Sequence, residues 1–574
     1  MPIHNKEIGD CFDQVADLLE IGGANPFRIR AYRQAANTVS RLPRSVAEML
    51  KQGEELSELP GIGKDLAGKI VEIVRSGKLQ LLEDLKKKNP PGITALLQVP
   101  SLGPQRVKKL NKELKVKSLA DLEKAAKEGR IRGLGGFGEK TERRILEALQ
   151  RTHGVERRFR WMLAKQMTLP LLDYLRKSKR VKDLEVAGSY RRRKDTVGDV
   201  DILATSESPQ EVMDRFTGYE DVSKVLAQGE TKATVLLRTG LQVDIRVVPE
   251  ASYGAALLYF TGSKAHNIAL RKLAQDRGFK INEYGVFDNK GRRLAGRSEE
   301  EIYRFLKMDW IPPELREDRG EIAAAQAKRL PRLVDWRDIR GDLHVHTEAS
   351  DGQASIETLA RRAQEKGYEF LAITDHSPYV GITHGLDPKR LRAQIKAIER
   401  LNGKLRGLRI LKGIEVDILE DGSLDLPNEV LKELDLAVGA VHGHFQLTRK
   451  KQTERILRAM DNPHFSIFAH PTGRLLGERP PYDVDMERLM EGAKQRGCFF
   501  EVNSEPDRMD LDDAACRMAK EMGLRLAIST DAHALDGLDL MELGVAQARR
   551  GWLEKNDVIN TLPLKDLLRA LDRG

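Results

Sequence analysis

Two aspartates separated by one residue stand in the segment Gly198-Asp199-Val200-Asp201, at the start of an apolar run. Alternate residues of a β-strand point to the same face, so both carboxylates can grip divalent cations. A third aspartate, Asp244, lies in Val243-Asp244-Ile245, which we expect to be a neighbouring strand. Three carboxylates on one face can hold two metal ions, as phosphoryl transfer requires. The spacing therefore predicts a phosphoryl-transfer site.

The segment Gly188-Ser189-Tyr190-Arg191-Arg192 precedes these aspartates by about ten residues. A helix that starts at such a glycine presents backbone N–H groups, to which Ser189 and Arg192 add hydroxyl and guanidinium donors for the β- and γ-phosphates of a nucleotide. Taken alone, Gly-Asp-x-Asp would more often be a hairpin turn. Together with the glycine-serine segment and the third aspartate, it favours a nucleotide site.

Metal-ligand side chains of a second kind gather after residue 341, where nine of the 12 histidines lie. His344 and His346 share one face of a strand end, and further histidines and carboxylates follow at later strand ends. A single buried histidine is usually structural, but this number of imidazoles and carboxylates suits two or three Zn²⁺, Mn²⁺ or Fe ions. The candidates are His344, His346, Asp351, His376, Glu415, His442, His470, Asp531 and His533.

The elements that must position these side chains differ between the two sites. Around the aspartates, short β-branched segments predict strands of one sheet, at 184–187, 200–204, 234–237 and 243–248. After Gly341, short apolar strands alternate with helical stretches, which predicts a parallel barrel. The expected barrel strands are 342–346, 369–374, 409–415, 435–441, 466–469, 498–502 and 525–530. Chemistry in such barrels takes place at the carboxyl ends of the strands, where the candidate ligands lie.

Glycine-rich turns between helical segments mark the first 150 residues. Leu59-Pro60-Gly61-Ile62-Gly63-Lys64 leads into one helix, and Val99-Pro100-Ser101-Leu102-Gly103-Pro104 leads into another that carries Arg106. A looser third copy, at 133–138, precedes a helix expected at 139–149. One such turn is weak grounds for a function, but three copies followed by basic residues favour binding to DNA phosphates. We single out Gly61, Gly63, Lys64, Gly103 and Arg106 as DNA contacts.

The charge of the chain divides at about residue 340. Residues 1–340 carry 64 Lys and Arg against 48 Asp and Glu, whereas residues 341–574 carry 33 against 39. A basic half suits a polyanion, although a solvated basic surface is the common alternative. The sequence shows neither an apolar run long enough to cross a membrane nor a secretion signal, so we expect a cytoplasmic protein without a membrane partner.

The first 315 residues resemble the family X DNA polymerases, the group that includes DNA polymerase beta. The resemblance rests on Gly-Ser-x-Arg-Arg, Gly-Asp-x-Asp and Tyr259-Phe260-Thr261-Gly262-Ser263. It implies that Asp199, Asp201 and Asp244 are catalytic ligands of Mg²⁺ or Mn²⁺, and that gapped or nicked double-stranded DNA and dNTPs are the partners. It places the nucleotide against Gly188, Ser189, Arg192, Gly198, Tyr259, Phe260, Gly262, Lys264 and Asn267, with Arg271 on the template strand.

Two departures from this family bear on function. Lys264 stands where beta-like members usually carry aspartate, which adds a cationic contribution to nucleotide binding. Lys69 matches the Schiff-base lysine of the family's lyase members, and Tyr32 also matches, but Asp65 replaces a second expected lysine and Arg28 another. Lys69 is therefore a hypothetical lyase nucleophile.

Residues 338–574 resemble the polymerase and histidinol phosphatase (PHP) domain. The resemblance implies a distorted (β/α)7 barrel with metal-dependent phosphoesterase chemistry, and all nine candidate ligands match by residue. Next to a polymerase, the implied substrate is a DNA 3′ end, with abasic-site cleavage and 3′-phosphate removal as extensions. Glu501 and Asn503 could contact the substrate or only complete the barrel. Asp375 could support His376 instead of binding metal.

The sequence thus predicts a multidomain, monomeric protein that fills short gaps in DNA repair and trims 3′ ends. It would combine an α-helical helix-hairpin-helix N-terminal part, an α+β nucleotidyltransferase core and the PHP barrel. The expected segments are 1–90 (DNA-binding), 91–150 (fingers-like), 151–250 (palm), 251–315 (thumb-like), 316–338 (linker) and 339–574 (PHP). The alternatives are a barrel that is structural or a small-molecule phosphatase, and a DNA-end binder with decayed sites.

Overall fold

The N-terminal part is helical, as the sequence predicts. The computed structural model describes residues 5–42, 46–59, 61–88, 91–97, 99, 102–138, 141–143, 145–146, 149 and 158–573. The first helices are α1 (Asn5–Ile21), α2 (Pro26–Arg41), α3 (Val46–Lys51), α4 (Lys64–Ser76) and α5 (Gln80–Lys88), with the 3-10 turn η1 (Leu56–Glu58). Their apolar faces enclose one core that includes Phe12, Tyr32 and Ile70.

A second helical core follows, built by α6 (Pro91–Leu97), α7 (Pro104–Leu114) and α8 (Leu119–Lys127) around Val107, Leu110 and Leu122. Pro104 occupies the first turn of α7, where its missing N–H leaves no helical bond unmade. Pro100, Ser101 and several residues of the expected helix 139–149 lie outside the described residues.

A five-stranded sheet, in the order β2-β4-β7-β6-β5, forms the centre of the palm. Its strands are β2 (Leu184–Val186), β4 (Asp199–Thr205), β5 (Val222–Gln228), β6 (Lys232–Leu237) and β7 (Gln242–Val248). Helices α10 (Trp161–Arg176) and α12 (Pro209–Thr217) bury apolar residues in the same core, while the short strands β1 (Phe159–Arg160) and β3 (Thr196–Val197) pair beside it. Strands β4 and β7 are adjacent and parallel, which sets the spacing of the aspartates.

The thumb-like part packs three helices against a small sheet. Its helices are α13 (Tyr253–Thr261), α14 (Lys264–Asp276) and α15 (Glu299–Phe305), and its strands are β8 (Lys280–Asn282), β9 (Gly285–Phe287) and β10 (Arg293–Ala295). The segment 316–338, expected as a linker, holds the helix α16 (Glu321–Gln326), and Arg316 in it is fully buried. Part of this segment therefore packs as structure instead of only spanning a gap.

The C-terminal domain is a parallel barrel of seven strands that follow one another in sequence order. The strands are β11 (Gly341–Asp342), β12 (Phe370–Ile373), β13 (Arg409–Asp417), β14 (Leu436–Ala440), β15 (Phe465–Phe468), β16 (Phe499–Asn503) and β17 (Leu526–Ser529). A parallel bridge between Val345 and Ala532 joins the two ends of the sheet, so the ring nearly closes. Each of the seven expected strands has a counterpart, although the first covers only Gly341–Asp342 instead of 342–346, and the predicted barrel class is confirmed.

Helices surround this barrel. They are α17 (Ile356–Glu365), α18 (Pro388–Asn402), α19 (Asn428–Leu431), α20 (Arg449–Met460), α21 (Met486–Arg496), α22 (Asp513–Met522), α23 (Met541–Arg550) and α24 (Leu564–Leu571). Their apolar faces bury residues such as Leu359, Ile456 and Leu489 against the strands. Within the described part of the chain, no helix is both long and apolar enough to span a membrane.

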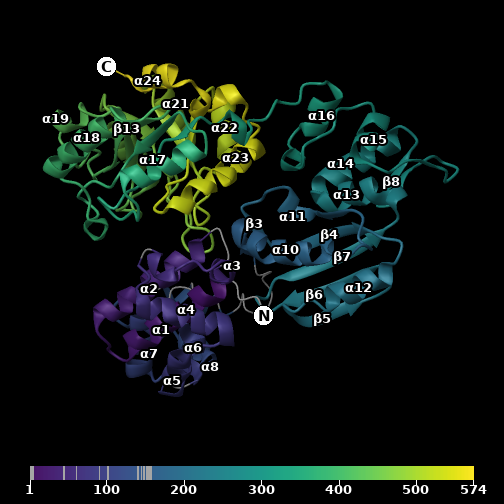
Figure 1. Ribbon diagram of the computed structural model, residues 1–574, viewed down its shortest axis with the longest axis horizontal. Coiled ribbons are helices and arrows are strands. Elements are labelled where there is room, and N and C mark those ends of the chain that lie inside the picture. Colours follow the sequence, from purple (N-terminus) through teal and green to yellow (C-terminus); the bar gives the residue numbers. More distant parts are fainter. Residues whose placement is uncertain are drawn as a thin grey trace.

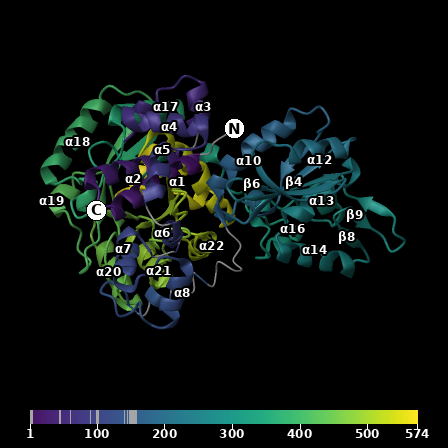
Figure 2. The same ribbon diagram turned by 90° about the horizontal axis from the view of Figure 1, so that it is seen from below.

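The barrel domain contacts both other parts of the molecule. In Figure 1 the N-terminal helices lie below the barrel, and the palm and thumb extend to the right; Figure 2 shows the N-terminal helices and the barrel on one side and the palm on the other. The palm core includes Met509, Leu540 and Leu543 from the barrel domain, and the thumb core includes Trp552. The palm and the barrel therefore share apolar cores.

Candidate active sites

The three predicted catalytic aspartates lie on the adjacent strands β4 and β7. Asp201 and Asp244 are register partners, and Asp199 is two residues before Asp201 on the same strand. Thr234 Oγ1 donates to Asp244 Oδ1 at 2.5 Å and Gln242 Nε2 donates to Oδ2 at 2.8 Å, which fixes this carboxylate. Burial, together with the charges of Asp199 and Asp244, raises the pKa of Asp201 to about 7. A cation would relieve this repulsion, so the donor set fits divalent metal.

The predicted phosphate-binding turn lies directly against this triad. The short helix α11 (Gly188–Arg191) begins at Gly188, whose φ is +65°. A Cβ at this position would come within 3.0 Å of Asp201 Oδ2. Glycine is therefore required both by the backbone angle and by the close approach to the carboxylate. Ser189 is half-buried beside it, and Gly198 lies just before β4.

Three consecutive arginines leave this turn in different directions. Arg191 donates from both terminal nitrogens to Glu299 in the thumb, at 2.8 and 3.0 Å. Arg192 donates from Nε to Glu317 Oε1 at 3.0 Å and from Nη1 to the Thr261 carbonyl at 2.5 Å. Arg193 pairs with Glu542 of the barrel domain at 2.9 Å. The turn that carries Ser189 thus contacts the thumb, the segment 316–338 and the barrel domain.

The remaining predicted nucleotide contacts lie on α13 and α14, next to Arg192. A Cβ on Gly262 would stand 3.1 Å from Arg192 Nη1, so these two predicted residues are neighbours. Tyr259 and Phe260 meet edge to face with ring centroids 5.1 Å apart. Asn267 Nδ2 donates to the Tyr259 carbonyl at 2.6 Å. Lys264 and Arg271 are exposed on α14.

The predicted DNA contacts of the helical region lie at helix starts. Gly63 and Gly103 are the N-cap residues of α4 and α7, so the first turns of both helices have no side-chain cap. Gly61, Lys64 and Gly103 are exposed, and Arg106 is half-buried over the Phe137 ring. Lys69, the hypothetical nucleophile, forms an ion pair with Asp65 one turn earlier.

In the barrel, the structure brings all nine predicted ligands to one end. Eight of them form three overlapping compact groups, in each of which the potential ligand atoms lie within 4.8 Å of one another, and His470 lies beside these groups. His344, His346 and Asp531 make one group, while His470 Nε2 lies 3.0 Å from Glu415 Oε1. The other two groups are His346, Asp351, His376 and His533, and His376, Glu415 and His442.

Several buried atoms of this cluster have no hydrogen-bond partner among the described residues. They are His344 Nε2, both ring nitrogens of His346, His376 Nδ1, Glu415 Oε2 and His470 Nδ1. His376 Nδ1 and Glu415 Oε2 stand 2.8 Å apart without hydrogen-bond geometry. Buried polar atoms that lack partners are costly, and imidazole and carboxylate atoms that converge in this way suit metal ions. The residues therefore fit a metal cluster.

The pKa shifts in the cluster follow its mixed charges. Against the cost of burial, Glu415 and Asp351 raise the pKa of His376 to about 11. Burial and the neighbouring His533 and His376 lower the pKa of His346 to about 4. Nearby histidines hold the pKa of Glu415 well below its usual range despite its burial. Without metal, protons on some imidazoles balance the carboxylates, and bound cations would displace them.

A ring of supporting residues orients the ligands, and the sequence left most of these roles open. Glu501 Oε1 lies 2.8 Å from His344 Nδ1, and its other oxygen accepts from the backbone N–H of His470 at 2.6 Å. Asp417 Oδ1 lies 3.1 Å from His442 Nδ1. Asp375 accepts hydrogen bonds from Thr347, Ser350 and Gln394. Carboxylates that bond the second nitrogen of a ligand histidine fix its orientation.

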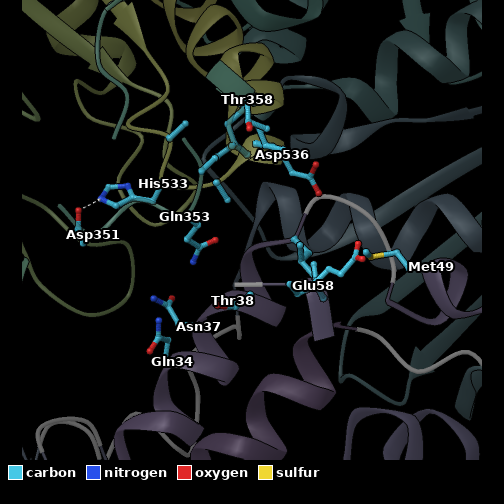
Figure 3. A pocket seen from close by; sticks show the side chains of 18 of the residues that line it. Gln34, Asn37, Thr38, Met49, Glu58, Asp351, Gln353, Thr358, His533 and Asp536 are labelled. Atoms are coloured by element: carbon cyan, nitrogen blue, oxygen red, sulfur yellow. Dashed lines mark ion pairs between the residues drawn. The ribbon is translucent and has the colours of Figure 1, made fainter. Parts of the chain in front are cut away.

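A cavity of about 660 Å³ lies between this cluster and the N-terminal helices. Figure 3 shows Asp351 and His533, joined by an ion pair of 3.5 Å, on one side of it. Gln34, Asn37 and Thr38 of α2 lie on the opposite side. The metal-ligand cluster is thus reached through a space that two domains line.

Family models match five stretches of the chain. They describe a helix-hairpin-helix domain at 3–79, a SAM-like helix-hairpin-helix tandem at 93–151, a DNA polymerase beta palm at 165–256, a DNA polymerase beta thumb at 256–317 and a PHP domain at 342–504. These matches follow the same order as the structural parts described above.

The chain is similar to curated proteins of two kinds. The DNA polymerase/3′-5′ exonuclease PolX of Bacillus subtilis (strain 168) is 38% identical over 575 residues, covering 100% of both chains. A probable phosphatase of Thermoanaerobacter sp. (strain X514) is 31% identical over 232 residues, which span 38% of this chain and 89% of that protein. A probable phosphatase of Caldanaerobacter subterraneus is 34% identical over 33% of this chain and 75% of its own length. The chain belongs to the family X DNA polymerases that carry a C-terminal PHP domain.

Proposed function

We propose that this protein is a DNA polymerase that fills short gaps and a 3′→5′ exonuclease that trims DNA ends. The observation that carries the proposal is the presence in one chain of two separate clusters whose residues fit metal ions. The full-length similarity to a protein named for both activities supports it. Gapped or nicked DNA and dNTPs would be the substrates of a monomeric enzyme.

At the polymerase site, each group has a role that its position favours. Asp199, Asp201 and Asp244 would hold Mg²⁺ or Mn²⁺, which supplies charge neutralisation and activates the attacking hydroxyl. Ser189 and Arg192 would bind the β- and γ-phosphates of the nucleotide. Tyr259 and Phe260 would lie against its sugar, and Asn267 beside the new base pair.

Other residues would hold the nucleic acid. The helix starts at Gly61, Gly63 and Lys64, and at Gly103 and Arg106, would grip DNA phosphates without reading sequence. Arg271, exposed on α14, would contact the template strand, and Lys264 would add positive charge beside the incoming nucleotide.

In the barrel, His344, His346, Asp351, His376, Glu415, His442, His470, Asp531 and His533 would hold two or three Zn²⁺, Mn²⁺ or Fe ions. Such ions activate water and stabilise charge on the leaving oxygen of a phosphoester. Glu501 and Asp417 keep His344 and His442 oriented through their second ring nitrogens. A DNA 3′ end would enter through the cavity between α2 and Asp351. Abasic-site cleavage and 3′-phosphate removal would use the same ligands.

A small-molecule phosphatase is the second candidate for the barrel. The observation in its favour is the similarity of this domain alone to probable phosphatases. The excess of acidic residues after residue 341 also suits a small substrate better than a polyanion.

The experiment uses gapped DNA labelled at the primer 5′ end, with dNTPs and Mg²⁺ or Mn²⁺. We expect Asp199→Ala to abolish primer extension and to spare 3′-end degradation, because Asp199 is an exposed residue at the start of β4, in the palm and outside the barrel cluster. We expect His344→Ala to do the reverse. Lys366→Ala, a change at an ion pair with Asp539 outside both sites, serves as the matched control.

The outcomes separate the candidates. If the metal-loaded wild-type protein leaves 3′ ends intact but releases phosphate from a small phosphoester in a His344-dependent manner, the barrel is a phosphatase. If Asp199→Ala still extends primers, the assignment of the triad is wrong.

A further inference from the structure

Arg550, the last residue of α23 in the barrel domain, reaches into the nucleotide-binding part of the palm. Its side chain is only 2% exposed. Its Nη1 donates to the Arg192 carbonyl at 2.7 Å and to Glu317 Oε1 at 3.2 Å. Its Nη2 donates to Asp513, at the start of α22. A residue far from the palm in sequence thus contacts the backbone of Arg192, which is predicted to bind the phosphates of the nucleotide.

Glu317 connects the two arginines. The same oxygen, Oε1, accepts from Arg192 Nε at 3.0 Å and from Arg550 Nη1 at 3.2 Å. Despite burial, the charges of Arg192 and Arg550 hold the pKa of Glu317 below its usual range, so this carboxylate is ionised near neutral pH. Ionised partners make short, strong hydrogen bonds, and burial limits their screening.

The side chains around Glu317 and Asp513 carry more positive than negative charge. Arg319 Nη1 lies 3.2 Å from Asp513 Oδ2, the oxygen that Arg550 also contacts. The three guanidinium groups of Arg192, Arg319 and Arg550 therefore share the two carboxylates of Glu317 and Asp513. Because Glu317 also accepts a hydrogen bond from Arg550, its negative charge is shared between Arg192 and Arg550.

We propose that Arg550 is a positioning residue for the polymerase reaction, which keeps Arg192 oriented and available for the phosphates of the incoming nucleotide. This role rests on the proposed polymerase function. Arg550 acts in two ways: it fixes the carbonyl at the end of the Gly188–Arg192 turn, and it divides the charge of Glu317. The barrel domain thereby contributes to nucleotide binding without touching the nucleotide.

Removal of Arg550 would leave Glu317 with Arg192 as its remaining guanidinium partner in this group, and the Arg192 carbonyl without this donor. The turn would loosen and Arg192 would bind phosphates more weakly. The loss concerns nucleotide binding, so it raises KM for the dNTP more than it changes kcat.

The test measures single-nucleotide incorporation into gapped DNA by the full-length protein across a range of dNTP concentrations. We expect Arg550→Ala to raise KM for the dNTP about tenfold, as the loss of one charge-assisted interaction does, with kcat within about twofold. Arg549→Ala is the matched control. Arg549 is the preceding residue of α23 and also crosses to another domain, but it bonds Glu314 at 2.7 Å and the Val334 carbonyl at 3.1 Å.

Two further variants separate positioning from folding. Arg550→Lys keeps one donor but cannot serve Glu317, Asp513 and the carbonyl together, so its KM should lie between those of the wild type and Arg550→Ala. Adding Arg550→Ala to Glu317→Gln should raise KM less than it does in the wild-type background, because Arg550 acts partly through Glu317.

The outcomes are distinct. If the wild-type protein extends primers and Arg550→Ala leaves KM for the dNTP unchanged, the positioning role alone is overturned. If Arg550→Ala does not fold, an unchanged KM in Arg550→Lys has the same meaning. An equal rise in Arg549→Ala assigns the effect to domain docking and overturns it as well. If the wild-type protein incorporates no nucleotide, the proposed polymerase function fails, and this role fails with it.

Discussion

At the residue scale, the aspartate triad destabilises the metal-free folded protein when Asp201 is ionised. Asp201 is largely buried, and it faces Asp199 and Asp244 while carrying a pKa raised to about 7. An aspartate in an unfolded chain has a pKa of about 3.9. Between these values the folded protein holds a proton that the unfolded chain has lost. Stability from this group is therefore fully present below about pH 4 and is lost as the pH rises to about 7.

We predict that Asp201→Asn stabilises the metal-free protein at pH 8, because it removes the buried charge. The gain should be at most about 4 kcal/mol and should vanish near pH 4. Chemical denaturation in a chelator at both pH values measures it, with fluorescence of the palm residue Trp161 as the probe. Asp199→Asn, at the exposed end of the pair, is the control and should gain less. An equal gain at pH 4 and pH 8 would rule out the electrostatic cause.

At the element scale, the thumb is tied to the palm by a buried ion network. Glu299, at the start of α15, accepts from Arg191 of α11 and from the fully buried Arg316, whose nitrogens lie 2.5 and 2.9 Å away. Against the cost of burial, Arg316 and Arg191 lower the pKa of Glu299 to about 2. Its stabilising contribution is present above about pH 4.5 and is lost as the pH falls toward 2.

We predict that Glu299→Gln destabilises the thumb–palm contact by about 3–5 kcal/mol, because it leaves Arg316 buried without its counter-charge. Thermal unfolding at pH 7 should show the loss, and the difference from wild type should shrink as the pH approaches 2. Glu300→Gln, one residue along the same helix and exposed, is the matched control. A pH-independent difference would contradict the proposed charge effect.

The helix α4 offers a separate test of the lyase hypothesis. The Lys69 amine is engaged by Asp65 on the preceding turn, which opposes its use as a nucleophile. We predict little borohydride-trapped adduct with abasic DNA in the wild type and more in Asp65→Ala. Lys69→Ala in the Asp65→Ala background should remove the gain. If the adduct persists without Lys69, another amine forms it.

Predictability from sequence also depends on the element. Four of the five strands of the palm sheet and the strands of the barrel were predictable because β-branched runs and strand-end ligands mark them locally, whereas the strand Val222–Gln228 was not predicted. Asp201 opposite Asp244 follows from adjacent parallel strands. The contacts of Glu501 with His344 and of Glu317 with Arg192 were not predictable, because these partners meet only after distant segments fold together. The α16 helix was missed because its alanine-rich sequence offers few bulky apolar residues, although Arg316 is buried just before it.

At the scale of the whole molecule, the barrel domain completes the apolar core of the palm. Leu540 and Leu543 lie in the palm cluster and are 5% and 2% exposed. Polar contacts reinforce the joint: Lys165 and Arg193 of the palm both pair with Glu542 at 2.9 Å. Helix α23 therefore belongs structurally to both domains. Its removal would expose apolar palm surface in addition to breaking ion pairs.

We predict that Leu543→Ala destabilises the palm although the residue lies in the barrel domain. Truncation of a buried leucine costs about 2–5 kcal/mol, and the cavity would open in the palm cluster. Hydrogen exchange should therefore speed up in the palm strands β4 and β7, which share that core. Leu567→Ala, equally buried but within a cluster inside the barrel domain, is the control and should leave exchange in β4 and β7 unchanged. If Leu543→Ala accelerates exchange only in the barrel strands, the palm is stable without α23, and the shared core is a contact of two independently stable domains.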